Sequence, residues 1–438
     1  MTALQAPSLP RRRRSSLRIG AIFLLACTIA FAFEEYLEPL ISGGESGETH
    51  SSLLASRVVY ERLVSSWPRV LRPQHSAIVS IGPTKESDPL GVTADNVCDQ
   101  RQFIARLLLA LAAREPREIV LDKYFGKDRC PADSPGTVAL FAAMDQVSRS
   151  RARGGSGIPV VVGLRIQEGR EAAQINGQEA YAIDRPLDFD GPELNVYEGI
   201  VNTDQDFRRL PVGWTIERKE GKASWQGSLS YVAAFLKLRK DTLNERPVLL
   251  GRLGNRLESP FISFIRPREF TVVPSTQVLC ASTLLTSAAR QACTLGGGGP
   301  ALENLKGKIV FVGEFDRDRD WHSGFPEATY GVFLQANYVE AILDDRYFVA
   351  AGRWVDYLAG LLIFLGLKVA LHRPKKWETA ASIAAVALVT AMALFIGVRI
   401  FGVFIDPAGS TLVIAVMIIS WSFEKVVHAG SEGQHGKK

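Results

Sequence analysis

The sequence predicts an α/β fold in which a large, mostly parallel sheet is flanked by helices and attached to membrane-spanning helices. Two observations predict it. Between residues 77 and 343, short apolar runs alternate with segments of helical periodicity, which is typical of βαβ units and a parallel sheet. Four further segments are strongly apolar, and apolar stretches of about twenty residues indicate membrane helices; they cover residues 19–33, 354–371, 379–398 and 403–423.

The composition suits a protein that is partly soluble and partly in a membrane. The chain has 438 residues, enough for one large domain or two ordinary ones. Hydrophobic residues make up 47% of it and the mean hydropathy is +0.06. The net charge of +5 is small for this length, and the basic clusters lie beside apolar segments, so nucleic-acid binding is not expected.

The N-terminal region predicts a membrane helix. Residues 1–18 are polar and basic, with Arg11–Arg14 in a row, and residues 19–33 are apolar. We expect a helix whose N-terminus is cytoplasmic. A cleaved signal peptide is the alternative, since Ala30-Phe31-Ala32 matches the A-x-A pattern of a cleavage site. In both cases the following segment is exported.

The exported region, residues 34–353, carries the alternating pattern. Strands are expected at residues 77–81, 119–121, 159–164, 261–265 and 309–312, and helices at 53–64, 102–113, 137–148, 229–238, 277–289 and from 332. The helix at 102–113 places Arg101 and Arg106 off its apolar face, and the helix from Val332 shows one apolar stripe. Residues 165–227 predict an irregular insertion that borders a ligand site, and residues 296–299 a flexible connector.

The charges of the C-terminal region predict its orientation. Arg373, Lys375 and Lys376 follow the segment 354–371, and residues 424–438 also carry lysines. With four membrane helices these basic groups and the N-terminus all lie on one side, which the positive-inside rule places in the cytoplasm. Residues 34–353 then lie outside.

The cysteines predict two disulfides. Cys27 lies in the first apolar segment, and Cys98, Cys130, Cys280 and Cys293 lie in the exported region. Four cysteines allow three pairings, and we expect Cys98–Cys130 and Cys280–Cys293 because sequence neighbours meet most readily. Buried free thiols are the alternative, and zinc is disfavoured because no CxxC spacing occurs.

The stretch 305–348 resembles the C-terminal part of a CHASE2 domain, the extracytoplasmic sensor module of bacterial receptors. Such domains show a "kGKIVxIG" strand, a loop with Asp and Pro, and then "GVxxxANxxxxLL". The matching residues are Lys306, Gly307, Lys308, Ile309, Val310, Gly313, Asp320, Pro326, Gly331, Val332, Ala336, Asn337 and Leu343. One departure is Gly324-Phe325-Pro326, which replaces the usual Thr-Pro pair.

Two earlier segments extend the resemblance. Ile119, Val120, Asp122 and Phe125 match the family's "vvxDxxF" pattern, and Arg62-Leu63 matches the pair that opens such domains. The resemblance implies a multi-pass protein of the bacterial inner (plasma) membrane, with one helix before the periplasmic or extracellular domain and three after it.

The resemblance also implies signal transduction. CHASE2 receptors usually continue into a cytoplasmic cyclase, kinase or diguanylate cyclase, whereas here residues 424–438 follow the last helix. We therefore expect a sensor for an unknown small ligand that passes its signal to a separate partner protein, with a homo-oligomer as one arrangement. The alternative is a structural or assembly subunit of a cell-envelope complex that binds no ligand.

The candidate site residues follow strands. Parallel sheets build ligand sites at the carboxyl ends of their strands, and Asp122 and the loop containing Asp320 and His322 follow two predicted strands. We expect these three residues to line one ligand pocket. No catalytic motif occurs, so no enzyme activity, cofactor or metal is expected. Asp316, Asp318 and Asp320 with Glu327 could instead form a calcium-type loop, but Trp321 holds the position where that loop needs glycine.

Overall fold

The computed structural model describes the chain in two units, residues 65–347 and residues 1–64 with 348–438. The predicted helix 53–64, the connector 296–299, Cys293, Asp316 and Asp318 lie outside the described residues. The described residues are 21–29, 71–82, 96–149, 157–167, 173–175, 178–184, 187, 189, 194–202, 210–218, 222–238, 249–250, 256–257, 260–282, 302–315, 320–322, 329–371, 376–404 and 410–422.

A parallel sheet forms the centre of the unit 65–347, as the sequence predicts. Within the described residues it has six strands, all paired in parallel. Their central segments are apolar on both faces, because helices cover both sides of the sheet. In spatial order the strands are β12 (Val272–Pro274), β1 (Ser76–Ile81), β13 (Ile309–Glu314), β2 (Glu118–Tyr124), β3 (Val160–Leu164) and β6 (Val196–Ile200).

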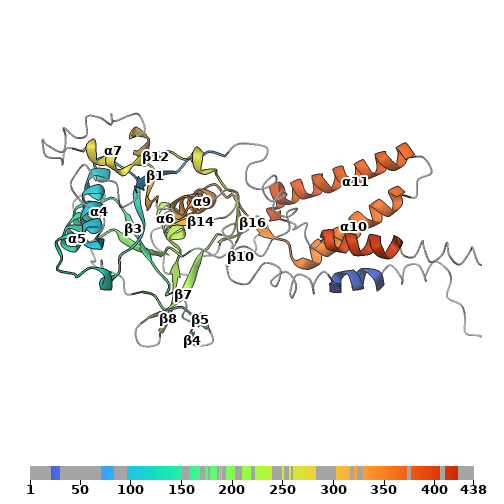
Figure 1. Cartoon of the computed structure of the whole chain (residues 1–438), viewed down its shortest axis with the longest axis horizontal. Helices are drawn as coiled ribbons and strands as arrows, with labels where there is room; N and C mark the ends of the chain where they lie inside the picture. The colour runs from blue at the N-terminus through green and yellow to red at the C-terminus, as the bar shows by residue number, and fades with distance from the viewer. Residues whose placement is uncertain are drawn as a thin grey trace, which may run out of the picture. The chain divides into compact units, whose positions relative to one another are not determined.

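Helices lie on both faces of this sheet (Figure 1). On one face α4 (Val97–Ala112), α5 (Pro135–Ser148) and α7 (Ser275–Cys280) pack on alternate strand residues such as Val79 and Leu121. On the other face lie α6 (Leu229–Leu238) and α9 (Gly331–Leu343). Residues between those of the first core, such as Ile78 and Phe311, are buried as well, because successive strand side chains point to opposite faces.

Local capping explains where α4 and α5 begin. Asn96 accepts a hydrogen bond from the backbone N–H of Cys98 at 2.8 Å, so α4 starts at Val97 rather than at the predicted residue 102. Ser134 accepts one from the N–H of Thr137, and Pro135 occupies the first turn of α5. These are preferred residues for such positions, since they satisfy or remove unpaired N–H groups.

Several predicted elements differ from the structure. Strand β2 continues through Asp122 to Tyr124, the strand predicted at 261–265 is only β11 (Phe261–Ile262), and α7 ends at Cys280. The insertion 165–227 holds β6 and an antiparallel hairpin of β7 and β8. The remaining short strands of this unit are β4 (Ala173–Ile175), β5 (Gln178–Ala180), β7 (Gly213–Arg218), β8 (Lys222–Gly227), β9 (Leu249–Leu250), β10 (Arg256–Leu257), β14 (Trp321–His322) and β15 (Thr329–Tyr330).

Helix α9 is buried around its whole circumference. All but the last of its residues, Gly331 to Ile342, are buried, whereas the sequence predicted a single apolar stripe. The helix packs between the sheet and α6, so polar Gln335, Asn337 and Glu340 are buried with it. Each of these three side chains makes hydrogen bonds, as burial of polar groups requires.

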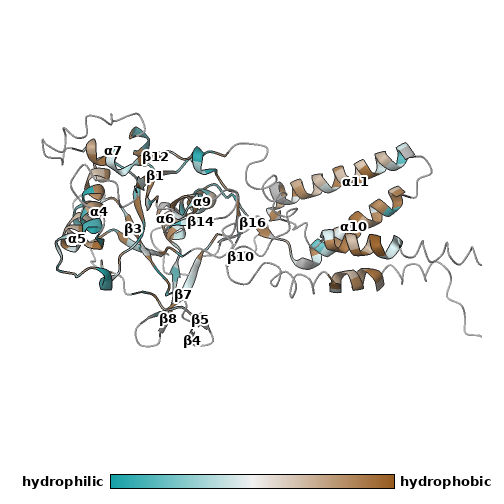
Figure 2. Ribbon diagram, viewed as in Figure 1, coloured by the Kyte–Doolittle hydropathy of each residue, from teal (hydrophilic) through white to brown (hydrophobic). Residues whose placement is uncertain are grey.

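The other unit consists mainly of apolar helices. Helices α10 (Arg353–Leu371) and α11 (Lys376–Ile396) are predominantly hydrophobic (Figure 2), and their segments 354–371 and 377–396 are long and apolar enough to cross a membrane. A π-helical turn, η8 (Gly397–Phe401), follows α11 and ends at Gly402 in a left-handed conformation. Strands β16 (Tyr347–Ala350) and β17 (Val403–Phe404) then pair in parallel.

The prediction of four membrane spans is corrected to two candidate spans within the described residues. The first and last predicted segments are helical over 21–29 and 410–422, and a helix needs about twenty residues to cross the hydrocarbon core. Both nevertheless pack on α10 through a shared apolar cluster. It contains Ala26, Cys27, Tyr357, Phe364, Val413 and Met417.

Candidate functional site

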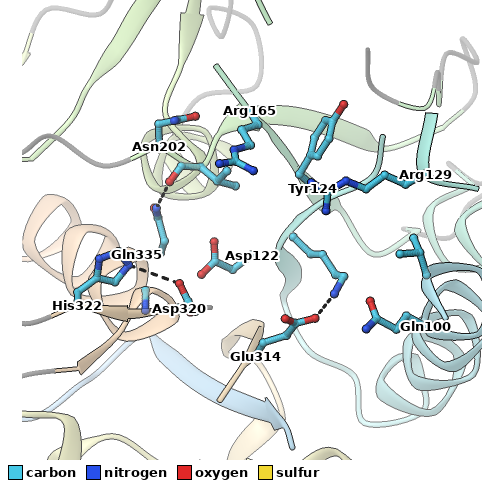
Figure 3. Close-up of a pocket in the computed structure, with 14 residues that line it drawn as sticks. Gln100, Asp122, Tyr124, Arg129, Arg165, Asn202, Glu314, Asp320, His322 and Gln335 are labelled. Atoms are coloured by element: carbon cyan, nitrogen blue, oxygen red, sulfur yellow. Dashed lines mark hydrogen bonds and ion pairs between the residues drawn. The ribbon is translucent and has the colours of Figure 1, made fainter. Parts of the chain in front are cut away.

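A cavity of about 580 Å³ lies at the carboxyl ends of the central strands (Figure 3). Strands β13 and β2 are neighbours, yet the helices that follow them, α9 and α5, lie on opposite faces. The two chain segments therefore diverge and leave a crevice, the usual position of ligand sites in parallel sheets. Its polar lining residues are Gln100, Asp122, Lys123, Tyr124, Arg129, Arg165, Asn202, Glu314, Asp320, His322 and Gln335.

Asp122 lies inside β2, where the pairing with β3 becomes irregular between Leu121 and Tyr124. Within the described part of the chain its carboxyl has no hydrogen bond or ion pair. Burial, then the charges of Asp320 and Glu314, raise the pKa of Asp122 well above its usual value, and Lys123 offsets part of this. A carboxyl group in this environment favours its neutral form until a cation approaches.

Asp320 is fixed at the beginning of α9. Its Oδ2 accepts a hydrogen bond from the backbone N–H of Gly331 at 3.0 Å, and its Oδ1 lies 3.4 Å from Nε2 of His322. The hairpin of β14 and β15 pairs His322 with Thr329, directly before that helix. An acidic group at a helix N-terminus is favourable, because the helix dipole is positive there.

Glu314 completes the acidic part of the lining. It is the last residue of β13, and its carboxylate forms an ion pair with the ammonium group of Lys123 on β2. Both side chains are about four-fifths buried, with exposures of 20% and 19%. This pair neutralises one of the carboxylates that face the cavity, whereas Asp122 has no such partner among the residues that the structure describes.

Two arginines contribute the positive charge of the cavity. Arg129 ends the short helix η3 (Lys127–Arg129), which follows β2, and Arg165 directly follows β3. Tyr124 lies near both. Burial, and next the charge of Asp184, raise the pKa of Tyr124 to about 12, while Arg129 and Arg165 act in the opposite direction. The phenol is therefore neutral at physiological pH and can serve as a hydrogen-bond donor.

Two amide side chains of the lining are held by the backbone. Oδ1 of Asn202 accepts a hydrogen bond from the N–H of Ile166 at 2.8 Å. Nε2 of Gln335 donates to the carbonyl of Val201 at 3.0 Å, and its Oε1 accepts from the hydroxyl of Ser230. These bonds link α6, α9 and the segments after β3 and β6, so this wall of the cavity is fixed before any ligand arrives.

The CHASE2 domain family matches residues 48–371. The chain belongs to the CHASE2 domain family. CHASE2 domains are extracellular sensory domains, and the match includes the whole sheet and every residue that lines the cavity. No curated protein and no solved structure is significantly similar to the chain.

The CHASE2 motif residues position the cavity wall. A methyl group on Gly313 would lie 2.5 Å from Cβ of Val332, so this glycine lets α9 approach β13 closely. The side-chain amide of Asn337 forms two hydrogen bonds with the backbone of Ile265. Its Oδ1 accepts from the N–H at 2.6 Å, and its Nδ2 donates to the carbonyl at 3.1 Å. The motif therefore anchors α9, which carries Gly331 and Gln335 into the cavity.

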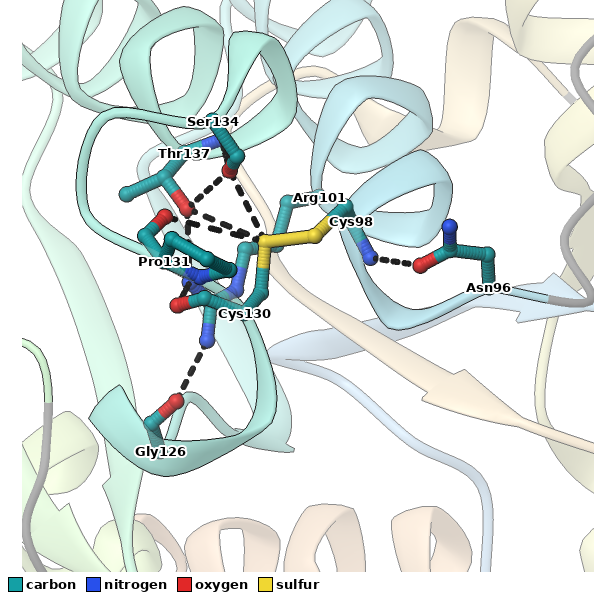
Figure 4. The surroundings of a disulfide bond; sticks show 8 residues. All are labelled: Asn96, Cys98, Arg101, Gly126, Cys130, Pro131, Ser134 and Thr137. Carbon is teal, nitrogen blue, oxygen red and sulfur yellow. Dashed lines mark hydrogen bonds between the residues drawn. A yellow bond between two sulfur atoms is a disulfide. The ribbon is translucent and has the colours of Figure 1, made fainter.

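The predicted disulfide between Cys98 and Cys130 is present (Figure 4). Beside it the guanidinium of Arg101 donates to the carbonyls of Gly126 and Cys130, at 2.5 and 3.1 Å, and to the hydroxyl of Thr137 at 2.6 Å. Arg101 is only 1% exposed, although periodicity placed it off the apolar face. Its burial arises because α5 and the disulfide loop cover that side of α4.

The second predicted disulfide is described on one side only. Cys280 is disulfide-bonded, and its expected partner, Cys293, lies outside the described residues. Cys27 is a buried free thiol.

A second polar cluster contains His75, Glu340 and Asp344, whose potential metal-ligating atoms lie within 4.8 Å of one another. Both oxygens of Glu340 already accept backbone hydrogen bonds, Oε2 from Gln74 at 3.0 Å and Oε1 from His75 at 2.8 Å. Nε2 of His75 lies 3.0 Å from Oδ1 of Asp344. These contacts hold the backbone directly before β1, and we interpret the cluster as structural.

The structure brings the three predicted site residues, Asp122, Asp320 and His322, into one cavity; that they bind a ligand stays a prediction. Sequence reasoning missed Glu314 and Arg165. Each lies at the carboxyl end of a predicted strand, so the rule that parallel sheets bind ligands at those ends would have found both. Arg129 carried no such signal, because it reaches the cavity through the loop that the Cys98–Cys130 disulfide closes.

Proposed function

We propose that this CHASE2 protein is a membrane-anchored extracytoplasmic sensor whose cavity binds a small polar ligand. The observation that carries the proposal is the carboxyl of Asp122, which has no partner among the described residues although the neighbouring Glu314 and Asp320 are paired. A folded protein gains nothing in stability from burying such a group, whereas a ligand can compensate its charge. The volume of about 580 Å³ lies within the range of small-molecule sites.

The proposal includes the bacterial inner membrane as the location, with residues 34–353 outside the cytoplasm. The two apolar helices support membrane association, and the basic residues beside the apolar segments support the orientation. Residues 344–352 alone separate α9, which lines the cavity, from α10. A ligand that favours one position of α9 would thereby act on the first span after the sensor domain.

The output would be a separate signalling protein in the same membrane. The test is to purify the full chain in mild detergent after crosslinking in the membrane, and to identify what is bound by mass spectrometry. The same preparation is heated with and without a mixture of small polar metabolites. The sensor proposal predicts that the mixture raises the melting temperature and that a signalling enzyme co-purifies.

The opposite result has a definite meaning. If no mixture raises the melting temperature and the chain copurifies with envelope-assembly proteins in fixed stoichiometry, the sensor proposal is wrong. The structural or assembly subunit would then be the function to pursue.

A further inference from the structure

The charges of the cavity are separated onto two sides (Figure 3). Glu314 and Asp320 lie on one side of Asp122, and Arg165, Tyr124 and Arg129 lie on the other. A ligand of one charge would be attracted by one side and repelled by the other. The arrangement therefore favours a molecule that carries both charges, one at each end.

The acidic side is prepared for a cation. Glu314 is paired with Lys123, and Asp320 with the N–H of Gly331 and with His322. Asp122 lies next to both carboxylates and has no partner among the described residues. A positive group placed there would counteract the repulsion from the two carboxylates, which now opposes the ionisation of Asp122.

An ammonium group suits this position better than a bare metal ion. A hard cation needs several oxygen ligands that converge at about 2 to 2.6 Å. Among the described residues, the groups whose potential ligand atoms all lie within 4.8 Å of one another do not include Asp122, Asp320 and Glu314. An ammonium group forms longer bonds to separate acceptors through its three donors.

The basic side is prepared for a carboxylate. Arg165 follows β3 directly and is half-buried, and Arg129 lies at the exposed rim. Both arginines line the cavity on the same side as Tyr124 (Figure 3). Guanidinium groups bind carboxylates through two parallel hydrogen bonds, which fixes orientation as well as charge.

We propose that the cavity binds a small zwitterion, an amino acid or short peptide, with its ammonium group at Asp122 and its carboxylate at Arg165 and Arg129. This inference rests on the proposed sensor function and adds the chemical class of its ligand. The volume of about 580 Å³ leaves space for a side chain between the two charged ends.

The test uses the purified full chain in detergent and the twenty proteinogenic L-amino acids and diglycine as probes. Each probe is added singly while the melting temperature is recorded, and a probe that raises it is titrated by calorimetry. Its N-acetyl derivative, which lacks the ammonium group, and its amide, which lacks the carboxylate, are then compared. We expect each derivative to bind more weakly by on the order of tenfold to a hundredfold.

Variants assign each end of the ligand to its side of the cavity. Asp122→Asn should strongly weaken the binding of the zwitterion and bring its affinity close to that of the N-acetyl derivative for the wild-type protein. Arg165→Gln should bring it close to that of the amide. Asp133→Asn, at an exposed position of the same loop region, is the matched control and should bind normally. The melting temperature of each ligand-free variant shows that it is folded.

Failure of this inference is distinguishable from failure of the sensor. If a mixture of sugars, organic acids, amines and nucleosides raises the melting temperature but the amino acids and diglycine do not, the zwitterion proposal is wrong and the sensor proposal stands. Equal binding of the probe and both derivatives, or unchanged binding by Asp122→Asn, also overturns it. If nothing raises the melting temperature, both proposals fail.

Discussion

The backbone N–H of Gly331 donates a hydrogen bond to Oδ2 of Asp320 at 3.0 Å, and the carboxylate occupies the space that a side chain at position 331 would need. A methyl group at position 331 would lie 2.5 Å from Oδ1 of Asp320. Both residues line the cavity. The first residue of α9 thus determines where one of the cavity's carboxylates lies.

Gly331→Ala should therefore displace Asp320 from the cavity wall. We expect weaker ligand binding and a loss of about 1 kcal/mol in stability, because the added methyl group meets only the end of the Asp320 side chain, which can turn away but then loses its hydrogen bond. Melting temperature and calorimetric titration measure the two effects. The matched control is Gly352→Ala, where the added methyl group meets nothing within 4 Å; equal effects of the two substitutions would contradict the prediction.

Asp122→Asn should stabilise the ligand-free protein at neutral pH, by about 1 to 3 kcal/mol, because it removes a carboxyl group that is harder to ionise in the folded protein than in the unfolded chain. The folded-state pKa is raised, so the destabilisation is absent below the ordinary value of 3.8, grows as the pH rises from there to the folded-state pKa, and is constant above it. The difference in melting temperature between variant and wild type should therefore shrink as the pH falls toward 4.

Asp320, Glu314, Lys123, His322 and Arg165 share the cavity with Asp122. They are present in both the wild type and the Asp122→Asn variant, so the difference in melting temperature between the two reports on residue 122 alone. A difference that grows on acidification would have the wrong sign for a raised pKa. Stabilisation combined with lost binding would show that the carboxyl is kept for function at a cost in stability.

Glu340→Gln should destabilise the fold by about 2 to 4 kcal/mol, since hydrogen bonds to a charged acceptor are stronger than neutral ones. The carboxylate of Glu340 is fully buried and also accepts from the N–H and the hydroxyl of Ser76, at 2.7 and 2.6 Å. Glutamine would turn an NH2 group toward one of these donors. Thermal unfolding measures the loss, with exposed Glu303→Gln as the control.

Arg101→Met should lower stability by about 2 to 5 kcal/mol, because the carbonyls of Gly126 and Cys130 would lose their buried donor. Arg101→Lys should not restore it, since one ammonium group cannot reach three separate acceptors. Arg106 is exposed on the same helix, and Arg106→Met should leave the melting temperature unchanged. A neutral Arg101→Met would mean that the guanidinium is not what holds the disulfide loop.

The strand predictions succeeded where composition alone decides the structure. Ile309 to Val312 are apolar without interruption, and such a run is buried on both faces wherever it lies. The order of the strands could not be predicted in this way. β13 inserts between β1 and β2, although about 190 residues separate it from β2 in the sequence, and periodicity holds no information on such distant pairing.

The polar residues show the limit of periodicity most directly. Arg101 lies off the apolar stripe of α4 and Glu340 is a charged residue within α9, yet both are buried. Their surroundings come from segments remote in sequence, the disulfide loop for Arg101 and the entry to β1 for Glu340. A polar side chain is buried when distant partners satisfy it, and only the fold supplies those partners.

The sequence by itself determined the α/β class, the parallel sheet, the Cys98–Cys130 pair, the CHASE2 family and the apolar C-terminal segments. These depend on local composition, spacing and motif, which a chain carries regardless of its partners. The tertiary structure decided that Asp122, Asp320 and His322 share a cavity with Glu314, Arg129 and Arg165. It did so because the charge that a carboxyl group experiences depends on which strands become neighbours, and that is fixed only when the sheet assembles.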